Sequence, residues 1–262
     1  MSGVSRKNSK IWKTLGPWLG GAAGIVLFLG GWTAAAASFH NVILVPSPWD
    51  VAISVGDLIR DGTLAGDLGA SLRRVFLGFA LAAGISVPLA LAMGAIVPLR
   101  WLLLPVISLL RPIPPIAWIP MAILWFGIGD ASGCFITALA AFFPVFINTL
   151  GAALSVEPQY LRAAQCLGAN RFVLLTRVYL PSALPAIWTG LKIGLGQSWM
   201  AVVTAELVAA QSGLGYMIQL NRIQLETPRV FVGMIVIAIT GTVMTAGLER
   251  LERVLFPWRH LR

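Results

Sequence analysis

The sequence predicts an all-α membrane protein with six transmembrane helices. Hydrophobic residues make up 58% of the 262 residues, charged residues make up only 11%, and the mean hydropathy is +0.84. Soluble domains carry about 25% charged residues, so we expect this chain to have the lipid bilayer as its solvent. Apolar runs that approach or exceed the roughly 20 residues needed to cross the hydrocarbon core lie at 18–39, 75–97, 101–126, 134–154, 186–210 and 230–248.

The first of these runs has two readings. Its basic start, its apolar stretch and the small residues at 34–38 also fit a cleavable signal peptide. A signal core spans only about 7 to 15 residues and this run is longer, so we expect a transmembrane helix. Cleavage would leave the orientation of the later runs unchanged.

The distribution of positive charge predicts that both termini are cytoplasmic. An even number of spans puts the termini on one side, together with Arg6, Lys7, Lys10, Lys13, Arg100, Arg162, Arg171, Arg177, Arg250, Arg253, Arg259 and Arg262. The other side holds only Arg60, Arg73, Arg74, Arg222 and Arg229. Cytoplasmic loops carry the excess of Lys and Arg, so the termini and the loop at 155–185 are expected in the cytoplasm.

Several classes of function find no support in the sequence. Cys134 and Cys166 are expected at opposite faces of the membrane and form no Cys/His cluster, so no metal site is predicted. The segment GLGYM at 213–217 lacks the ending of a phosphate-binding loop, and no catalytic constellation is visible, so the chain is not expected to be an enzyme. The basic residues lie at the ends of apolar runs rather than in one patch, so nucleic acid is not an expected partner.

The external segment at 40–74 contains one predicted helix. Pro46 and Pro48 break the chain, and Asp50 can cap a helix that runs to about Arg60. A solvated surface helix is the simplest interpretation of this segment.

The loop at 155–185 predicts a first short helix that starts at Glu157 and Pro158. One face of this helix is apolar but shallow, and it comprises Tyr160, Ala163, Ala164 and Leu167. Such a helix can lie on the membrane surface or dock on a partner, and the residues alone favour neither.

A second helix is expected after Gly168. This glycine can take the left-handed conformation that ends the first helix, and Asn170 can cap the second. The second helix would bring Phe172, Leu175 and Tyr179 together and would end at Pro181.

The loop resembles the "EAA loop" of ABC importer permeases. That pattern reads Glu-Ala-Ala, three residues, Gly, nine residues, Ile, any residue and Leu-Pro, and here Ala163, Ala164 and Gly168 match its first part. The chain departs from it with Arg162 in place of Glu and Val178 in place of Ile. The Arg162 departure removes any salt bridge that the family would make from that position.

Three further segments are similar to the nitrate/sulfonate/taurine/bicarbonate branch of that family, namely 111–130, 142–152 and 205–218. With the loop, these segments cover nearly everything after Ser71. The RAAQ at 162–165 and the AELVAA at 205–210 resemble taurine permeases more than nitrate permeases.

The resemblance implies a type I ABC importer (MetI-like) permease core in a bacterial inner membrane. Its parts would be a cytoplasmic tail at 1–17, the first helix at 18–39, a periplasmic segment at 40–74, a five-helix core at 75–248 and a tail at 249–262. The partners implied are a second copy of the chain, two ATP-binding subunits that hold ATP and Mg, a periplasmic binding protein and membrane lipid, with no cofactor on this chain. The substrate implied is a small anion, taurine or another sulfonate. A secondary transporter or channel without an ATPase partner is the alternative.

In this family the loop is a coupling helix that contacts the ATPase subunit. The resemblance places the contact at Tyr160, Arg162, Ala163, Ala164, Leu167, Gly168, Ala169 and Asn170.

Polar residues within the apolar runs are candidates for the transport path or its gate. Arg111 lies about 15 Å along a helix from Trp101, and Pro112, Pro114 and Pro115 should break that helix near mid-membrane. We expect its side chain to turn into the protein, with freed carbonyls among its partners, either on the path or as a structural group. The candidates for the path are Arg111, Asn148, Gln197, Thr204 and Glu206, and Glu206 is a plausible partner for Arg111.

Overall fold

The computed structural model describes residues 4–39 and 41–255, and all regular elements in this part of the chain are helical. The expectations for Arg259 and Arg262 lie outside the described residues. In chain order the helices are α1 (Val4–Phe39), α2 (Pro48–Arg60), α3 (Thr63–Ala95), α4 (Val97–Leu110), η1 (Pro115–Trp118), α5 (Ile119–Phe126), α6 (Asp130–Leu154), α7 (Pro158–Cys166), α8 (Arg171–Leu174), η2 (Leu175–Tyr179), α9 (Leu180–Ala209), α10 (Leu214–Ile223) and α11 (Thr227–Leu255).

Four helical stretches among the described residues are long and apolar enough to cross a membrane: Thr63–Ala95, Asp130–Leu154, Arg171–Ala209 and Thr227–Leu255. The third predicted run is broken as expected, because α4 and the η1–α5 segment meet at a bend of 91°. Counted as one span, this pair would make a fifth, and the apolar stretch Ala23–Phe39 of α1 is shorter. The count of six spans therefore stays a prediction.

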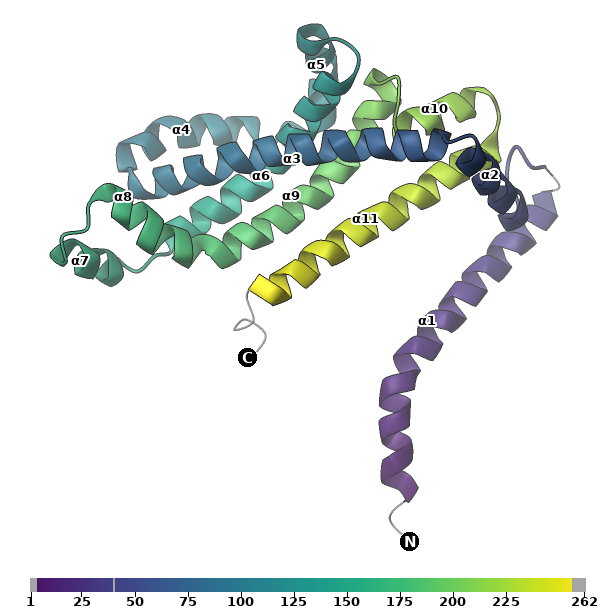
Figure 1. Cartoon of the computed structure of the whole chain (residues 1–262), viewed down its shortest axis with the longest axis horizontal. Helices are drawn as coiled ribbons and strands as arrows, with labels where there is room; N and C mark the ends of the chain where they lie inside the picture. The colour runs from purple at the N-terminus through teal and green to yellow at the C-terminus, as the bar shows by residue number, and fades with distance from the viewer. Residues whose placement is uncertain (1–3, 40, 256–262) are drawn as a thin grey trace. The chain divides into compact units, whose positions relative to one another are not determined.

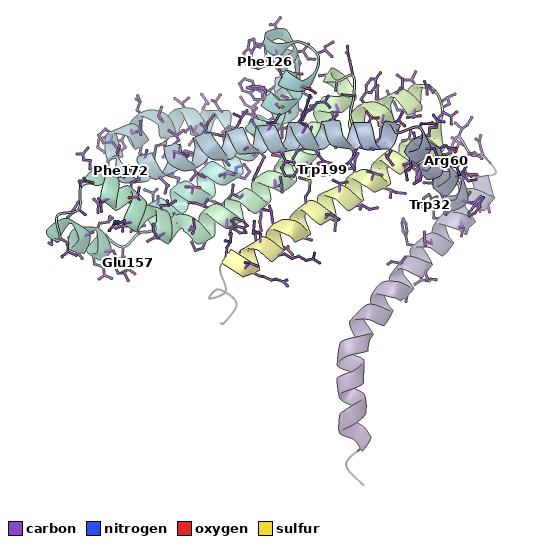
Figure 2. The ribbon with its side chains drawn as sticks, viewed as in Figure 1. Trp32, Arg60, Phe126, Glu157, Phe172 and Trp199 are labelled. Carbon is purple, nitrogen blue, oxygen red and sulfur yellow. The ribbon has the colours of Figure 1, made fainter. Side chains whose placement is uncertain are left out.

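The chain divides into two compact units, of which the first comprises Met1–Asp61 and Asn221–Val232. Within it the indole Nε1 of Trp32 donates to the Pro46 carbonyl at 2.9 Å, and the Trp32 ring stacks on Phe231 with centroids 5.5 Å apart. Trp32 and Arg60 are labelled in Figure 2. The hydroxyl of Thr227 also donates to the Ile43 carbonyl at 2.7 Å.

The N-cap of helix α2 lies three residues before the predicted one. Ser47, not Asp50, is the N-cap residue: its hydroxyl accepts from the Asp50 backbone N–H, and the Asp50 carboxylate accepts from the Ser47 backbone N–H at 3.0 Å. This reciprocal capping box satisfies two donors that the helix itself leaves free. The pKa of Asp50 is held below its usual value, first by the side-chain hydrogen bond from Ser47 and then by the backbone one.

The second unit comprises Gly62–Leu220 and Gly233–Arg262, and its centre is the packing of α3, α6 and α9 (Figure 1). Small residues allow these helices to approach closely. A Cβ at Gly78 of α3 would lie 2.7 Å from Thr137 of α6, and a Cβ at Gly194 of α9 would lie 2.9 Å from Val145 of α6. A side chain at either glycine would therefore force α6 away from its neighbour.

Helix α4 lies along α3 and closes one side of the bundle (Figure 1). It packs four apolar side chains on a buried cluster of α3 and α6 residues. The cluster comprises Ala90, Met93, Phe146 and Leu150, and α4 contributes Leu99, Leu103, Leu104 and Ile107.

The helix that was expected to end at Pro181 continues, so that prediction is wrong. Helix α8, a π turn at Leu175–Tyr179 and α9 follow one another without a break from Arg171 to Ala209. The π turn widens the helix directly before Pro181, where proline lacks an N–H and its ring needs room, and Pro181 lies at the start of α9. The loop at 155–185 is therefore rigidly joined to a membrane helix at its C-terminal end.

Candidate functional site

The predicted geometry of the loop at 155–185 is confirmed at both of its caps. Gly168 has φ +82°, and its N–H donates to the Gln165 carbonyl at 2.9 Å. Asn170 caps α8, because its side-chain oxygen accepts from the Val173 N–H at 2.9 Å. The left-handed glycine turns the chain sharply between α7 and α8. Figure 1 shows α7 and α8 at the end of α9 that lies away from α10.

The outer face of α7 carries apolar side chains that no described residue of this chain covers. Leu167 is 89% exposed, Tyr160 is 58% exposed, and Ala163 is exposed beside them. Phe172 on α8, after the turn at Gly168, is also 72% exposed; Figure 2 labels it, with Glu157 at the start of α7. Below, "loop face" means Tyr160, Ala163, Leu167 and Phe172.

One residue of the predicted face points the other way. Ala164 is half-buried and packs, with Leu161 and Ala169, on a core cluster that includes Leu174 and Tyr179. Helix α7 lies against the helical core on the side of Leu161 and Ala164, so Ala164 fixes α7 to its own chain. Placing it on the outward face was wrong.

Two path candidates share one hollow beside the broken helix. Gln197 and Thr204 of α9 line a hollow of about 210 Å³ with residues of η1 and α6. Gln197 is exposed in it, and the Thr204 hydroxyl donates to the Met200 carbonyl of its own helix at 3.0 Å. The full lining is Pro115, Ile116, Ile136, Ala140, Gln197, Met200, Ala201 and Thr204.

Asn148 and Arg111 do not contribute to this hollow. The Asn148 amide donates to the Pro144 carbonyl at 2.8 Å, and its Cβ faces Gly190, so Asn148 lies at the contact of α6 with α9. The Arg111 side chain is exposed and makes no hydrogen bond or ion pair with any described residue, so the expectation that it turns into the protein and binds freed carbonyls is wrong. The reason is local: the Arg111 backbone is still helical and bonds Ile107, so its side chain projects from the end of α4.

Glu206 is paired with Arg74 and not with Arg111. Arg74 was expected in the external segment at 40–74, and it lies in helix α3 instead. Arg74 of α3 is 1% exposed, and its Nη1 donates to the Glu206 carboxylate at 2.6 Å. Its other nitrogens reach Asp130 at 2.7 and 2.8 Å, and it donates to both the backbone and the side chain of Ser212 at 2.7 Å. Arg73 also pairs with Asp130. One guanidinium thus joins α3 to the start of α6, the end of α9 and the loop before α10.

The turn from α9 into α10 completes this cluster. Three successive N–H groups are bound by α3 or α9 side chains: Gly213 donates to Asp67 at 2.8 Å, Leu214 to Ser71 at 2.9 Å, and Gly215 to Glu206 at 3.0 Å. The first N–H groups of a helix lack partners in their own helix and carry partial positive charge, which favours a carboxylate there. Gly213 has φ +110°, and a Cβ on it would collide with the Glu206 carboxylate.

A signal for this cluster was present in the sequence. Asp67, Ser71 and Arg74 recur at helical spacing, so they share one face of a helix, and the GLG segment follows Glu206 closely. A second pair was missed as well: Lys192 of α9 binds Glu252 of α11. Lys192 is a charge inside an apolar run, and such a charge needs a partner.

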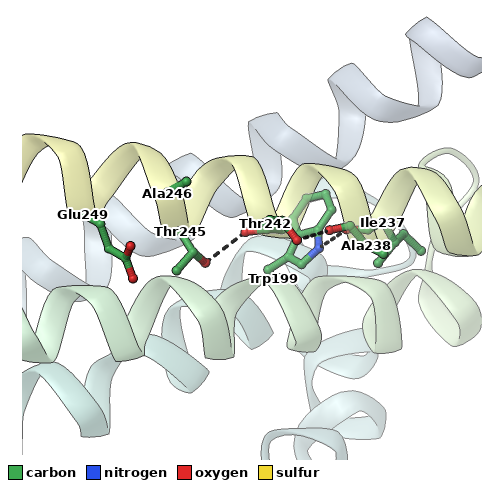
Figure 3. A pocket seen from close by; sticks show the side chains of 8 residues that line it. Trp199, Ile237, Ala238, Thr242, Thr245, Ala246 and Glu249 are labelled. Carbon is green, nitrogen blue, oxygen red and sulfur yellow. Dashed lines mark hydrogen bonds between the residues drawn. The ribbon is translucent and has the colours of Figure 1, made fainter. Parts of the chain in front are cut away.

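A second groove lies between α9 and α11 and is not suited to an anion. It has a volume of about 580 Å³, and Trp199 crosses it to donate to the Ile237 carbonyl at 3.0 Å (Figure 3). The hydroxyls of Thr242 and Thr245 donate to carbonyls of their own helix, and the one charged group in the lining is the acidic Glu249. The hollow at Gln197 is therefore the better candidate for the transport path.

Comparison with known proteins shows similarity along most of the chain. Residues 82–259 match the family described as binding-protein-dependent transport system inner membrane component. The taurine transport system permease protein TauC of Escherichia coli (strain K12) is 41% identical over 238 residues, which is 89% of this chain and 86% of that protein. The putative aliphatic sulfonates transport permease protein SsuC of Bacillus subtilis (strain 168) is 36% identical over 84% of this chain and 80% of that protein. The formylaminopyrimidine transport permease protein ThiX of Halalkalibacterium halodurans is 30% identical over 87% of this chain and 91% of that protein.

Proposed function

This chain belongs to the binding-protein-dependent transport system inner membrane components, and from that premise we propose that it forms the path of an ATP-driven importer for taurine or another small sulfonate. The observation that carries the choice of substrate is the 41% identity to a taurine permease across 89% of the chain. The chain is a multi-pass transport component of the inner membrane.

The working assembly contains two copies of this chain, two ATP-binding subunits and an external binding protein. ATP and Mg²⁺ bind to the ATP-binding subunits, and this chain holds no cofactor. Both termini and the loop at 155–185 face the cytoplasm, as the excess of Lys and Arg on that side favours. Lipid surrounds the apolar helix faces.

The loop face is the contact with the ATP-binding subunit. Leu167 and Phe172 are among the more exposed apolar side chains of the described chain, and they lie at the turn between α7 and the first turn of the helix from Arg171 to Ala209. Large apolar and aromatic side chains anchor protein interfaces when a partner covers them. Gly168, Ala169 and Asn170 set the angle at which α7 presents this face, and Arg162 offers a charge at its rim.

Transport follows from two packings of the same helices. Closure of the ATP-binding subunits moves α7, and the continuous helix from Arg171 to Ala209 carries this movement into the membrane. ATP shifts the population toward the outward-open packing, and its hydrolysis returns the inward-open one.

The hollow at Gln197 fits a ligand without net charge. Taurine carries a sulfonate and an ammonium group at neutral pH, so its charges cancel. The hollow holds no ionised side chain; the Gln197 amide can donate to a sulfonate oxygen and accept from an ammonium.

Uptake into proteoliposomes tests this function. The vesicles contain this chain with its ATP-binding subunit, are loaded with ATP and Mg²⁺, and receive binding protein and radiolabelled taurine outside. We expect uptake that requires both ATP and binding protein and that ethanesulfonate reduces more than nitrate does. Competition by formylaminopyrimidine instead of sulfonates would contradict the substrate, and uptake without the ATP-binding subunit would favour the secondary transporter.

A further inference from the structure

The two sides of α9 near its outer end carry different groups. Thr204 faces the hollow beside the broken segment, whereas Glu206 is 1% exposed and faces α3 and α10. At 3.6 residues per turn, two positions correspond to a rotation of about 200°, so these side chains lie on nearly opposite sides of the helix. Any rotation of α9 about its axis would move both together.

The Glu206 carboxylate accepts hydrogen bonds from three neighbouring residues. Arg74 Nη1 donates to it at 2.6 Å, the Ser71 hydroxyl at 2.8 and 2.9 Å, and the Gly215 N–H at 3.0 Å. These donors come from α3 and α10, so they hold the carboxylate from two directions. The hollow side has no such anchor, because Gln197 and Met200 are exposed there.

The rest of the contact between α9 and α6 includes small residues that do not interlock. Gly190 and Gly194 lie on α6 without a side chain of their own. The Ser198 hydroxyl donates to the Thr137 carbonyl of α6 at 3.2 Å, and the N–H of Gly129, directly before α6, donates to the Ala209 carbonyl at 3.0 Å. Small residues let helices approach closely, but they offer little resistance to rotation or sliding. The charged cluster is thus the strongest directional restraint on the outer half of α9.

We propose that Arg74 and Glu206 are a positioning pair that sets the rotation of α9, so that Gln197 and Thr204 face the broken segment on the transport path. The pair touches no substrate and acts through α9. Buried ion pairs are weak evidence for stability, since apolar replacements are often as stable, and fixing one packing among several is a role attested for buried polar groups. This inference rests on the proposed function for the identity of the path.

Thiol labelling reads the rotation directly. The background chain carries Cys134→Ala and Cys166→Ala, and single cysteines are then introduced as Gln197→Cys, Thr204→Cys or Val202→Cys. In the assembled transporter we expect a small water-soluble thiol reagent to modify the first two. The third should react poorly, because Val202 is fully buried.

Adding Glu206→Gln or Arg74→Lys should change this pattern. Reaction at Thr204→Cys should fall several-fold and reaction at Val202→Cys should rise, because the outer half of α9 is then free to rotate. Glu249→Gln is the matched control: it removes an exposed carboxylate from α11, and the pattern should stay that of the parent. Arg74→Lys keeps the buried positive charge but loses the forked donors, so it decides the matter if Glu206→Gln yields too little folded protein.

Two results would overturn the inference. One is the parental labelling pattern in folded protein that carries either variant, which would reduce the pair to a structural role. The other is a Thr204→Cys that does not react in the parent chain, because that face then lines no water-filled path. Taurine uptake by the parent chain is measured in the same vesicles, and its absence would count against the proposed function separately from the labelling result.

Discussion

Charged side chains within the apolar part of this chain differ in how they are satisfied. Arg74 and Glu206 are buried and share several hydrogen bonds, and Lys192 is paired with Glu252, whereas Arg111 is exposed. A buried charge that loses its partner is destabilising by more than an exposed charge, because the remaining charge keeps its desolvation penalty.

Replacing Arg74 should therefore destabilise the fold far more than replacing its neighbour. Arg74→Ala leaves Glu206 buried without its cation, and removing one partner of a buried pair costs about 3–5 kcal/mol. Arg73→Ala removes an arginine whose side chain is 62% exposed, and such surface pairs contribute about 1 kcal/mol or less. Thermal unfolding in detergent and the yield of folded protein measure both, and equal effects would contradict this account.

Gly168 should tolerate only residues that accept a left-handed backbone. Gly168→Val should impair binding of the ATP-binding subunit, because a β-branched residue resists φ +82°. Gly168→Asn should retain most of it, because asparagine enters that region more readily and no neighbour lies within 4 Å of a Cβ there. Pull-down yields distinguish the two, and equal yields would show that this turn does not orient α7.

At the scale of elements, the capping box of α2 should make its first turn sensitive to pH. The pKa of Asp50 is lowered in the fold by the hydrogen bonds from Ser47, so ionised Asp50 stabilises α2 above the pKa of the unfolded chain. This contribution is lost as the pH falls through the lowered pKa. Protection factors from hydrogen exchange should fall there in the parent and stay flat in Asp50→Asn.

The Ser47→Ala variant provides a second check on the same turn. It removes the N-cap hydroxyl and should destabilise α2 by about 1 kcal/mol at neutral pH. Unchanged protection in the first turn of Ser47→Ala would show that the capping box contributes little.

The sequence was informative about elements wherever local chemistry decides. The break after Leu110 follows from three prolines, and the turn at Gly168 and the cap at Asn170 follow from residue type. The stop expected at Pro181 failed because a π turn, which depends on the surrounding packing, accommodates the ring.

The charged cluster was harder to predict because it is tertiary. Asp67 and Arg74 share α3, but Asp130 and Glu206 are far from them in the chain, and each charge alone reads as a loop or membrane-edge charge. The side of α7 that carries Ala164 was missed for the same reason, since only the packed core shows which side it covers.

At the scale of the whole molecule, variants of Arg111 distinguish a role in the transport path from a role in assembly. If the exposed Arg111 serves the substrate, Arg111→Ala should lose taurine uptake at normal expression, while Arg111→Lys keeps part of it. If it serves assembly, Arg111→Ala should lower the amount of folded complex instead. Uptake and expression measured together distinguish these roles, and normal values of both would contradict either one.

The loop face is where this chain would meet the protein that hydrolyses ATP. Ala163 is exposed at its centre, between Tyr160 and Leu167, so a large charged side chain there would be buried without a partner on docking. Gln165→Glu is the matched control, because it adds the same charge to α7 at an exposed position away from that face.

Co-purification of the ATP-binding subunit with this chain is the measurement that tests the central claim most directly. The account predicts that the subunit co-purifies with the parent chain and with Gln165→Glu, and that Ala163→Glu loses it while still inserting in the membrane. Retention of the subunit by Ala163→Glu, with normal ATP-dependent taurine uptake, would contradict the account.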